Sequence, residues 1–134
     1  MLFDKNLRGV ERAMDGLALR FQAASQNLAN IHTPGYQRQI VDFEASLKEA
    51  IAAGETPIDP DNPMTGSPPS DSYMLEIWHP QRKTVERKQQ RIDGNGVSLE
   101  AEMADVTRTA LNFNMAATWV AAEYRNLKYV VDAR

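Results

Sequence analysis

The chain has no cysteine, only two histidines and no excess of basic residues among its 134 residues. The absence of cysteine excludes a disulfide framework and thiolate metal sites, and it makes the chain indifferent to the redox state of its compartment. The net charge of -3 argues against general affinity for nucleic acid, which usually requires a strongly basic protein or face. The basic run at 82–91 also lacks interleaved aromatic residues for base stacking. We therefore expect no nucleic acid among the partners.

Long apolar runs are absent as well. No stretch approaches the roughly 20 apolar residues that a membrane-spanning helix needs, so we expect no direct membrane insertion. Residues 1–8 contain no unbroken apolar segment of the kind found in secretory signals. If the protein leaves the cytoplasm, we expect a route other than ordinary cleavable secretion. With 43% apolar and 25% charged residues, the composition fits a single ordered domain.

Two long apolar seams dominate what the sequence does contain. In each seam, apolar residues recur at alternating spacings of four and three, which is the heptad rule of a left-handed coiled coil. At about 1.5 Å per residue, each seam predicts a helix roughly 45 to 50 Å long. The first seam comprises Phe3, Leu7, Val10, Met14, Leu17, Phe21, Ala24, Leu28 and Ile31, and the second comprises Leu99, Met103, Val106, Ala110, Phe113, Ala117, Val120, Tyr124, Leu127 and Val131.

The first helix has a clear end. Pro34 restricts its own φ and moves Thr33 out of the α region. Gly35 tolerates the positive φ that the third position of a type II turn requires. The first helix must therefore stop before this turn.

The second helix has a clear start. Residues 93–96 read Asp-Gly-Asn-Gly, which is a turn sequence, and Ser98 is a good N-cap before Leu99. Glu100 and Glu102 then place negative charge near the positive end of the helix dipole. Their two-residue spacing puts them on different helix faces rather than in one catalytic pocket. We interpret both as first-turn charges.

Three small residues form a stripe beside the first seam. Gly9, Gly16 and Ala23 are spaced by seven residues on an adjoining face. Glycine costs a helix roughly 1 kcal/mol relative to alanine, so two glycines in one stripe need an explanation. One explanation is simple tolerance in a helix that is stabilised elsewhere. The other is the close approach of a second helix.

The segment between the seams has a different character. Apolar spacing over 40–51 predicts a short helix that ends at Gly54. Residues 56–70 contain five of the chain's seven prolines and predict an extended loop. Short strands are predicted at 73–78 and 84–92.

The predicted fold is mainly α. Long N- and C-terminal helices form a coiled-coil-type pair, and a short irregular or small-β segment lies between them. In domain terms, residues 1–36 and 93–134 form the coiled-coil assembly domain, and 37–92 form a variable middle segment that includes the Pro-rich loop.

Charge is unevenly distributed within the middle segment. Residues 42–76 carry eight acidic side chains against one lysine, whereas 82–91 carry five basic side chains against one glutamate. One interpretation is a solvated surface. The other is a pair of complementary patches that set contacts between neighbouring subunits, where charge contributes more to specificity than to affinity.

No constellation of catalytic or metal-binding residues stands out in the sequence. His32 and His79 are better explained as a helix-end residue and a pre-proline loop residue than as metal ligands. No nucleophile elbow is present, and the Gly-Asn-Gly run at 94–96 lacks the third glycine of a dinucleotide fingerprint. We therefore expect no enzymatic activity, no metal and no cofactor.

Three further large side chains receive packing interpretations. Trp119 and Met103 are better explained as packing residues than as parts of a cofactor site. Trp78 lies in the middle segment, where it could anchor a small local core or an intersubunit contact. The sequence leaves both of these roles open.

The turn after the first helix carries a family resemblance. Residues 29–36 read Ala-Asn-Ile-His-Thr-Pro-Gly-Tyr, and this run resembles the signature of bacterial flagellar axial proteins, the family of rod, hook and hook-associated subunits. The runs at 37–47 and 93–103 and the short chain look most like the basal-body rod proteins of that family. The resemblance covers both ends of the chain well and the middle poorly. The residues that match the shared turn motif are Ala29, Asn30, Thr33, Pro34, Gly35 and Tyr36.

This resemblance implies a non-enzymatic structural subunit of the proximal rod. In such proteins the two terminal helices together form an inner tube domain, so both seams would mediate assembly. The implied partners are the chain itself, other flagellar rod proteins, the rod-base adaptor and the flagellar export apparatus. The implied location is the rod within the periplasm, reached by export without a cleavable signal. The alternative is an independent helical adaptor that binds a partner through one seam.

Overall fold

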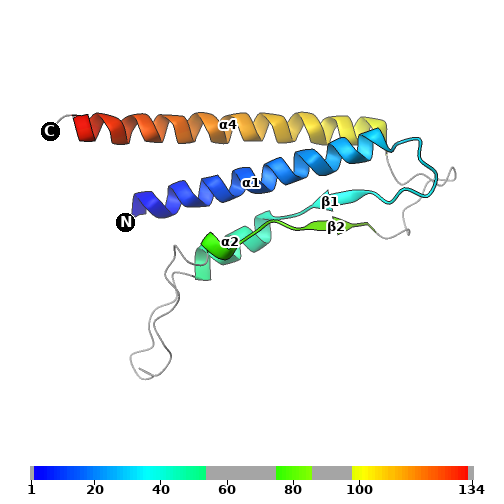
Figure 1. Cartoon of the computed structure of the whole chain (residues 1–134), viewed down its shortest axis with the longest axis horizontal. Helices are drawn as coiled ribbons and strands as arrows, with labels where there is room; N and C mark the ends of the chain where they lie inside the picture. The colour runs from blue at the N-terminus through cyan, green and yellow to red at the C-terminus, as the bar shows by residue number, and fades with distance from the viewer. Residues whose placement is uncertain (1, 54–74, 86–97, 133–134) are drawn as a thin grey trace, which may run out of the picture.

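The computed structural model describes residues 2–53, 75–85 and 98–132. The chain is mainly helical, with long N- and C-terminal helices and a short middle that contains a two-stranded sheet (Figure 1). This arrangement confirms the predicted fold class. The elements are α1 (Leu2–Ala29), β1 (Gln39–Val41), α2 (Glu44–Ala53), β2 (Arg82–Thr84) and α4 (Leu99–Asp132).

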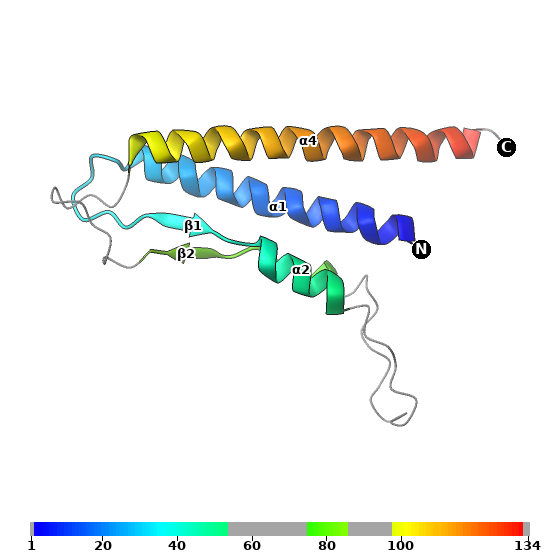
Figure 2. The same cartoon turned by 180° about the vertical axis from the view of Figure 1, so that it is seen from behind.

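The two long helices run side by side in opposite directions (Figures 1 and 2). α1 has 28 residues and α4 has 34. At about 1.5 Å per residue, they are about 42 Å and about 51 Å long. α4 extends past the N-terminus of α1 (Figure 1). Its last turns are consequently exposed, with Val130 at 70% and Val131 at 71%.

α1 ends where the turn residues require it to end. Its last residue is Ala29. The backbone N–H of Tyr36 donates to the carbonyl oxygen of Thr33 at 3.2 Å, which closes a turn with Pro34 and Gly35 at its centre. Gly35 has a φ of 74°, in the region that the third position of a type II turn needs. The predicted turn is confirmed.

The predicted start of the second helix is also confirmed. α4 begins at Leu99, and the N–H of Glu102 donates to the carbonyl oxygen of Ser98 at 3.0 Å. The turn predicted at 93–96 lies outside the described residues.

The strands occur elsewhere than predicted. β1 and β2 pair antiparallel, with Gln39 opposite Thr84 and Val41 opposite Arg82. The strand prediction at 73–78 is wrong, because residues 75–77 are helical. The prediction at 84–92 matches β2 only at Thr84, and residues 86–92 lie outside the described part of the chain. β1 and β2 are far apart in the sequence, so a local pattern could not reveal their pairing.

The predicted short helix is α2. It begins at Glu44 rather than at Ile40, because Ile40 pairs with Lys83 in the sheet. It ends at Ala53, next to the predicted end. The Pro-rich loop predicted at 56–70 lies outside the described residues.

The hydrophobic core lies between α1 and the middle segment. Phe113 of α4 packs against this core but is only partly buried. The buried residues of α4 are Glu102 and Thr109, which are both polar. α4 therefore contributes little to the core. The buried core residues are Leu17, Ala23, Val41, Phe43, Leu47, Ala50 and Leu75.

Candidate assembly surface and its polar anchor

The turn motif has an exposed rim and two residues, Asn30 and Tyr36, whose side chains form hydrogen bonds back to α1. Asn30 closes the helix end, since its side-chain Nδ2 donates to the carbonyl oxygen of Gln26 at 2.9 Å. The N–H of Thr33 donates to the carbonyl oxygen of Asn30 at 2.9 Å. The hydroxyl of Tyr36 donates to Oδ1 of Asn27 at 3.2 Å. The other motif residues, Ala29, Pro34 and Gly35, are exposed.

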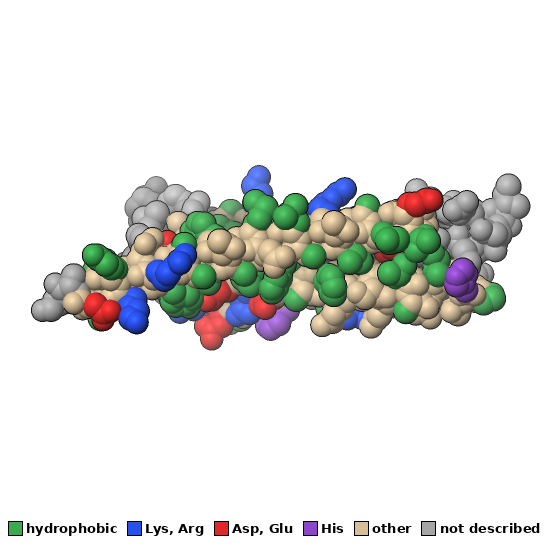
Figure 3. Space-filling view, turned by 90° about the horizontal axis from the view of Figure 1, so that it is seen from above, with side chains coloured by type: hydrophobic (Ala, Val, Ile, Leu, Met, Phe, Trp, Pro, Cys, Tyr) green, Lys and Arg blue, Asp and Glu red, His purple; other side chains and the backbone are tan. Residues whose placement is uncertain are grey.

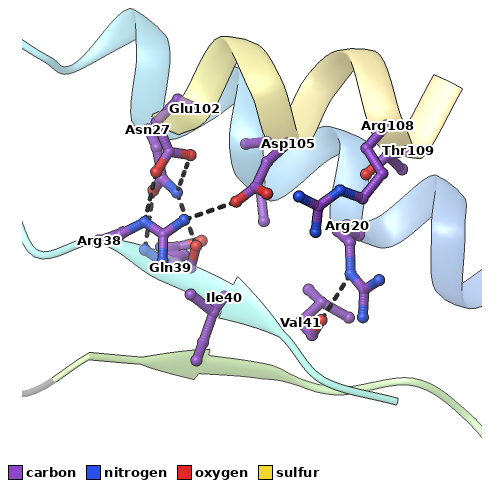
Figure 4. Close-up of a pocket in the computed structure, with 12 residues that line it drawn as sticks. Arg20, Asn27, Arg38, Gln39, Ile40, Val41, Glu102, Asp105, Arg108 and Thr109 are labelled. Atoms are coloured by element: carbon purple, nitrogen blue, oxygen red, sulfur yellow. Dashed lines mark hydrogen bonds and ion pairs between the residues drawn. The ribbon is translucent and has the colours of Figure 1, made fainter. Parts of the chain in front are cut away.

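Asn27 lies at the centre of a buried polar network (Figure 4). This residue is 1% exposed. Its Nδ2 donates to the carbonyl oxygen of Gln39 at 2.7 Å and to Oε2 of Glu102 at 3.0 Å. Its Oδ1 accepts from the N–H of Gln39 at 2.8 Å and from the Tyr36 hydroxyl. Both donors and both lone pairs of the amide are used, and they link α1, β1 and α4.

Glu102 is the partner of this network on α4. The residue is 0% exposed, and its carboxylate forms an ion pair with Arg38, which follows the turn motif. Arg38 also donates from Nη2 to Oδ2 of Asp105 at 2.9 Å. Glu102 lies in the first turn of α4, as interpreted from the sequence, but its carboxylate is buried and paired with Arg38 and Asn27 rather than exposed as a simple capping charge. Glu100 is exposed in the first turn.

Arg20 lies on the wall of a cavity of about 190 Å³ that adjoins this network (Figure 4). Its Nε donates to the carbonyl oxygen of Val41 at 2.9 Å, and its Nη2 donates to Oε2 of Glu44 at 2.6 Å. Its guanidinium lies 4.7 Å from the centroid of the Phe43 ring, within cation–π range. The hydrogen bond from Arg20 lowers the pKa of the Glu44 carboxyl. Arg20 thus attaches the middle segment to α1.

The first seam is only partly buried within the chain. Phe21 is 42% exposed, although it lies in the middle of α1. Ile31 lies beyond the last residue of α1. The side chain of Phe3 is outside the described residues. Leu17 and Ala24 are buried, and Leu7, Val10, Met14 and Leu28 are half-buried.

The second seam is buried to an even smaller extent. Its exposed members lie near both ends of α4, and Met103 is 54% exposed and Tyr124 is 52% exposed. Glu102 and Thr109, which lie beside the seam, are the buried residues of this helix. The half-buried seam residues are Val106, Ala110, Phe113, Ala117 and Val120, and the exposed ones are Leu99, Met103, Tyr124, Leu127 and Val131.

α4 carries a further apolar stripe on its outer side. Leu111, Met115 and Trp119 are spaced by four residues and are 59%, 64% and 43% exposed. Hydrophobic side chains gather along the length of the face that α4 presents in Figure 3. Trp119 and Met103 were expected to be packing residues, but this chain covers only about half of each. This chain therefore leaves the stripe of Leu111, Met115 and Trp119 largely uncovered.

A groove of about 330 Å³ lies between the two long helices. Leu17 and Phe21 line it from α1, and Ala110 and Phe113 line it from α4. All four belong to the predicted seams. The seams therefore meet along this groove without filling it.

The small-residue stripe faces the middle segment. A Cβ atom on Gly16 would come 2.6 Å from the ring of Phe43, and one on Gly9 would lie 3.6 Å from Cδ1 of Ile51 in α2. Ala23 is 1% exposed. At Gly16 and Gly9 the nearest side chains thus belong to Phe43, which precedes α2, and to Ile51 of α2, and not to the second long helix.

Trp78 anchors the local core. Its ring lies edge-on to that of Phe43, with centroids 6.2 Å apart. Its Nε1 donates to Oγ of Ser46 at 3.3 Å. This contact supports the first of the two roles considered for Trp78. Arg82, from the basic run, donates to side-chain oxygens of Gln22 and Gln26 at 2.9 Å each.

The described residues contain no group of three histidine or acidic side chains that could hold a metal ion. His32 is exposed, and Nδ1 of His79 lies 2.8 Å from the carbonyl oxygen of Ile77. No helix in residues 2–53, 75–85 and 98–132 has both the length and the apolar character needed to cross a membrane.

Sequence reasoning missed Asn27, Arg38 and Asp105. Asn27 follows Ala23 by four residues, so it continues the small-residue stripe on the face that is buried. A polar residue on that face was the available sequence signal for a buried polar contact. Arg38 and Asp105 carry no comparable signal, because their partners lie on distant elements.

These features define a class of protein. It is an elongated, coiled-coil-type protein whose C-terminal helix is incompletely covered and is anchored to the rest of the chain by buried polar groups. No protein-family model matches the chain.

The chain is similar along almost its whole length to flagellar basal body rod protein FlgB from several bacteria. It is 24% identical to FlgB of Borrelia hermsii over 133 residues, which cover 97% of this chain and 98% of that protein. It is 23% identical to FlgB of Escherichia coli K12 over 134 residues, with 97% and 95% covered. For FlgB of Salmonella typhimurium the identity is 25% over 137 residues, with 96% and 94% covered. The similarity supports the FlgB family and includes the middle segment.

Proposed function

We propose that this chain is a structural subunit of the bacterial flagellar basal-body rod and acts as an FlgB-type protein of the proximal rod. The observation that carries this proposal is the end-to-end similarity to FlgB proteins, which accounts for about 97% of the chain. The turn from Asn30 to Tyr36 supports it independently, because that motif resembles the axial-protein signature. The subunit would assemble with other axial proteins into the drive shaft for motility, and it would not be an enzyme.

Residues 1–36 and 93–134 would form the assembly domain, and 37–92 the variable middle. The support is the uneven burial of α4, whose exposed large apolar side chains include Met103 at 54%, Met115 at 64% and Trp119 at 43%. Copies of the chain and other rod subunits would cover these residues and the two seams. Apolar burial at roughly 25 cal/mol per Å² is the driving force for such association.

The remaining parts of the proposal concern partners and location. The partners are the chain itself, other flagellar rod proteins, the rod-base adaptor and the export apparatus. The location is the rod within the periplasm, after export from the cytoplasm without a cleavable signal. An independent helical adaptor is not favoured, because relatives that match over nearly the whole chain are rod proteins by name.

Gene replacement in the bacterium that encodes the chain tests the biological role. Deletion should abolish swimming and leave basal bodies without a complete rod in electron micrographs. A plasmid copy should restore both. A motile deletion strain with intact rods would overturn the proposal.

Substitution on the outer stripe of α4 tests the assembly surface. Met115→Lys should block rod formation and the concentration-dependent association of the purified chain, measured by sedimentation. Met115→Leu is the matched control, since leucine and lysine have similar helix propensity and only lysine adds charge. Circular dichroism should show that both variants keep their helix content. Equal association of the two variants would count against this surface.

A further inference from the structure

The residues of α4 that face α1 differ from the seam that the heptad pattern predicts. Glu102 and Thr109 are 0% and 3% exposed, whereas Met103 of the seam is 54% exposed. Val106 and Phe113 of the seam remain half-buried. The line of residues that passes through Glu102 and Thr109 shares every second residue, Val106 and Phe113, with the predicted seam, and its other residues are displaced by one position. Successive residues on a helix are about 100° apart around its axis, so the two lines differ on average by half of that angle. α4 is therefore rotated by about 50° from the setting that would bury the whole seam at this end.

The observed rotation needs a physical cause, because the alternative would bury more apolar surface. On hydrophobicity alone, Leu99 and Met103 are better suited than Glu102 to the inner face. Glu102 lies there because its carboxylate is paired with Arg38 and accepts a hydrogen bond from Asn27 at 3.0 Å. Rotation toward the apolar seam would separate these groups. The buried carboxylate and amide would then lack partners, which is strongly unfavourable.

The partners of Glu102 are themselves held in place, Asn27 by the backbone of Gln39 and Arg38 by its own carbonyl oxygen, which accepts a hydrogen bond from the N–H of Val85 at 2.9 Å. Asn27 is attached to the backbone of Gln39 by bonds of 2.7 and 2.8 Å, so it cannot follow a rotating α4. Arg38 holds Asp105 at 2.9 Å as well as Glu102. Glu102 and Asp105 lie one turn apart on α4. Two points of attachment on one helix restrict its rotation as well as its position along α1.

We propose that Asn27, Arg38 and Glu102 form a polar lock that sets the rotation of α4 against α1 and keeps Leu99 and Met103 on the outside. A buried polar group in a helix pair can specify register in this way at a cost in stability. The three residues act by positioning α4. The consequence for assembly rests on the proposed function: the lock reserves outward-facing apolar residues for neighbouring subunits.

Thiol labelling of the monomer reads the rotation directly, because the chain has no cysteine of its own. Met103→Cys and Thr109→Cys are made separately, and the rate of reaction with a maleimide is measured. In the otherwise unchanged chain, the cysteine at 103 should react several-fold faster than the one at 109. In a chain that also carries Asn27→Leu, Arg38→Met and Glu102→Met, the rate at 103 should fall and the rate at 109 should rise. An unchanged pattern in the folded triple variant would overturn the lock.

Arg20→Met is the matched control. Arg20 lines the same cavity as Arg38, but its hydrogen bonds go to Val41 and Glu44. This variant should keep the original labelling pattern, and a reversal in it would overturn the assignment to the three lock residues. If circular dichroism shows that the triple variant is unfolded, Glu102→Gln replaces it. That single change keeps the shape of the side chain and removes its charge. The ratio of the two rates should fall, and an unchanged ratio would overturn the lock.

Sedimentation of the triple variant tests the link to assembly separately. Reduced association together with altered labelling supports the role of the lock in assembly. Unchanged association together with altered labelling overturns that role and leaves the positioning of α4 intact. Neither result depends on gene replacement, which tests the proposed function itself.

Discussion

Phe43 packs directly onto Gly16, and a Cβ atom on Gly16 would come 2.6 Å from its ring. Phe43 is 4% exposed and belongs to the hydrophobic core, so the ring has little room to move. Overpacking usually costs roughly 1 to 3 kcal/mol, and the change from glycine to alanine in a helix returns about 1 kcal/mol, so Gly16→Ala should destabilise the chain by up to about 2 kcal/mol. Chemical denaturation followed by circular dichroism measures this difference.

Gly9→Ala is the control for that prediction. Its added Cβ would lie 3.6 Å from Ile51, which is an ordinary contact distance. Because alanine favours a helix interior over glycine by about 1 kcal/mol, this variant should be as stable as the original chain or more stable. Equal losses of stability in Gly9→Ala and Gly16→Ala would contradict the close packing of Phe43 onto Gly16.

Gly35→Val should weaken the turn through its backbone alone. The residue has a φ of 74°, and no atom lies within 4 Å of an added Cβ, so the substitution meets strain without a clash. We expect a loss of roughly 1 to 2 kcal/mol or more, since a β-branched residue strongly disfavours this region. Gly35→Asn should be better tolerated, because asparagine adopts positive φ more readily. The midpoints of thermal unfolding of both variants measure this difference. Identical midpoints would contradict the expected backbone strain at position 35.

Glu44 should add stability that disappears in acid. Arg20 lowers the pKa of Glu44 below its usual value of 4.5, so the folded chain binds this proton less tightly than the unfolded chain. The contribution is fully present above about pH 4.5 and is lost as the pH falls through the lower folded-state pKa. The Glu44 side chain is 58% exposed, so the effect should be small. The free energy of unfolding of Glu44→Gln should approach that of the original chain on acidification. If the difference in free energy of unfolding between the two chains does not change with pH, that would argue against the ion pair between Arg20 and Glu44.

Tyr124 should report on the contact between α1 and α4 near the C-terminal end of α4. The charge of Glu11 raises the pKa of the Tyr124 phenol, whose hydroxyl lies 3.2 Å from Oε1 of Glu11. Glu11→Gln should therefore lower this pKa. An NMR titration of chain labelled with ¹³C in tyrosine measures the change. An unaltered titration would indicate that the helices are apart at this end in solution.

Local chemistry made the helix boundaries predictable from sequence. The type II turn depends on the restricted φ of Pro34 and the positive φ of Gly35, both of which are properties of single residues. The start of α4 at Leu99 follows from the turn and cap residues just before it. Heptad spacing likewise revealed two long helices, because that pattern repeats within each segment.

Tertiary contacts decided which side of each helix is buried. The heptad pattern favoured Met103 as an inner residue, yet Glu102 is the buried one because Asn27 and Arg38, distant in the sequence, are its partners. The pairing of β1 with β2 escaped prediction for the same reason. A sequence pattern expresses how apolar residues repeat along one element, whereas the pairing of buried polar groups depends on which elements meet. The sequence by itself therefore determined where the first long helix ends and where the second begins, and only the tertiary structure decided that α4 turns much of its apolar surface outward.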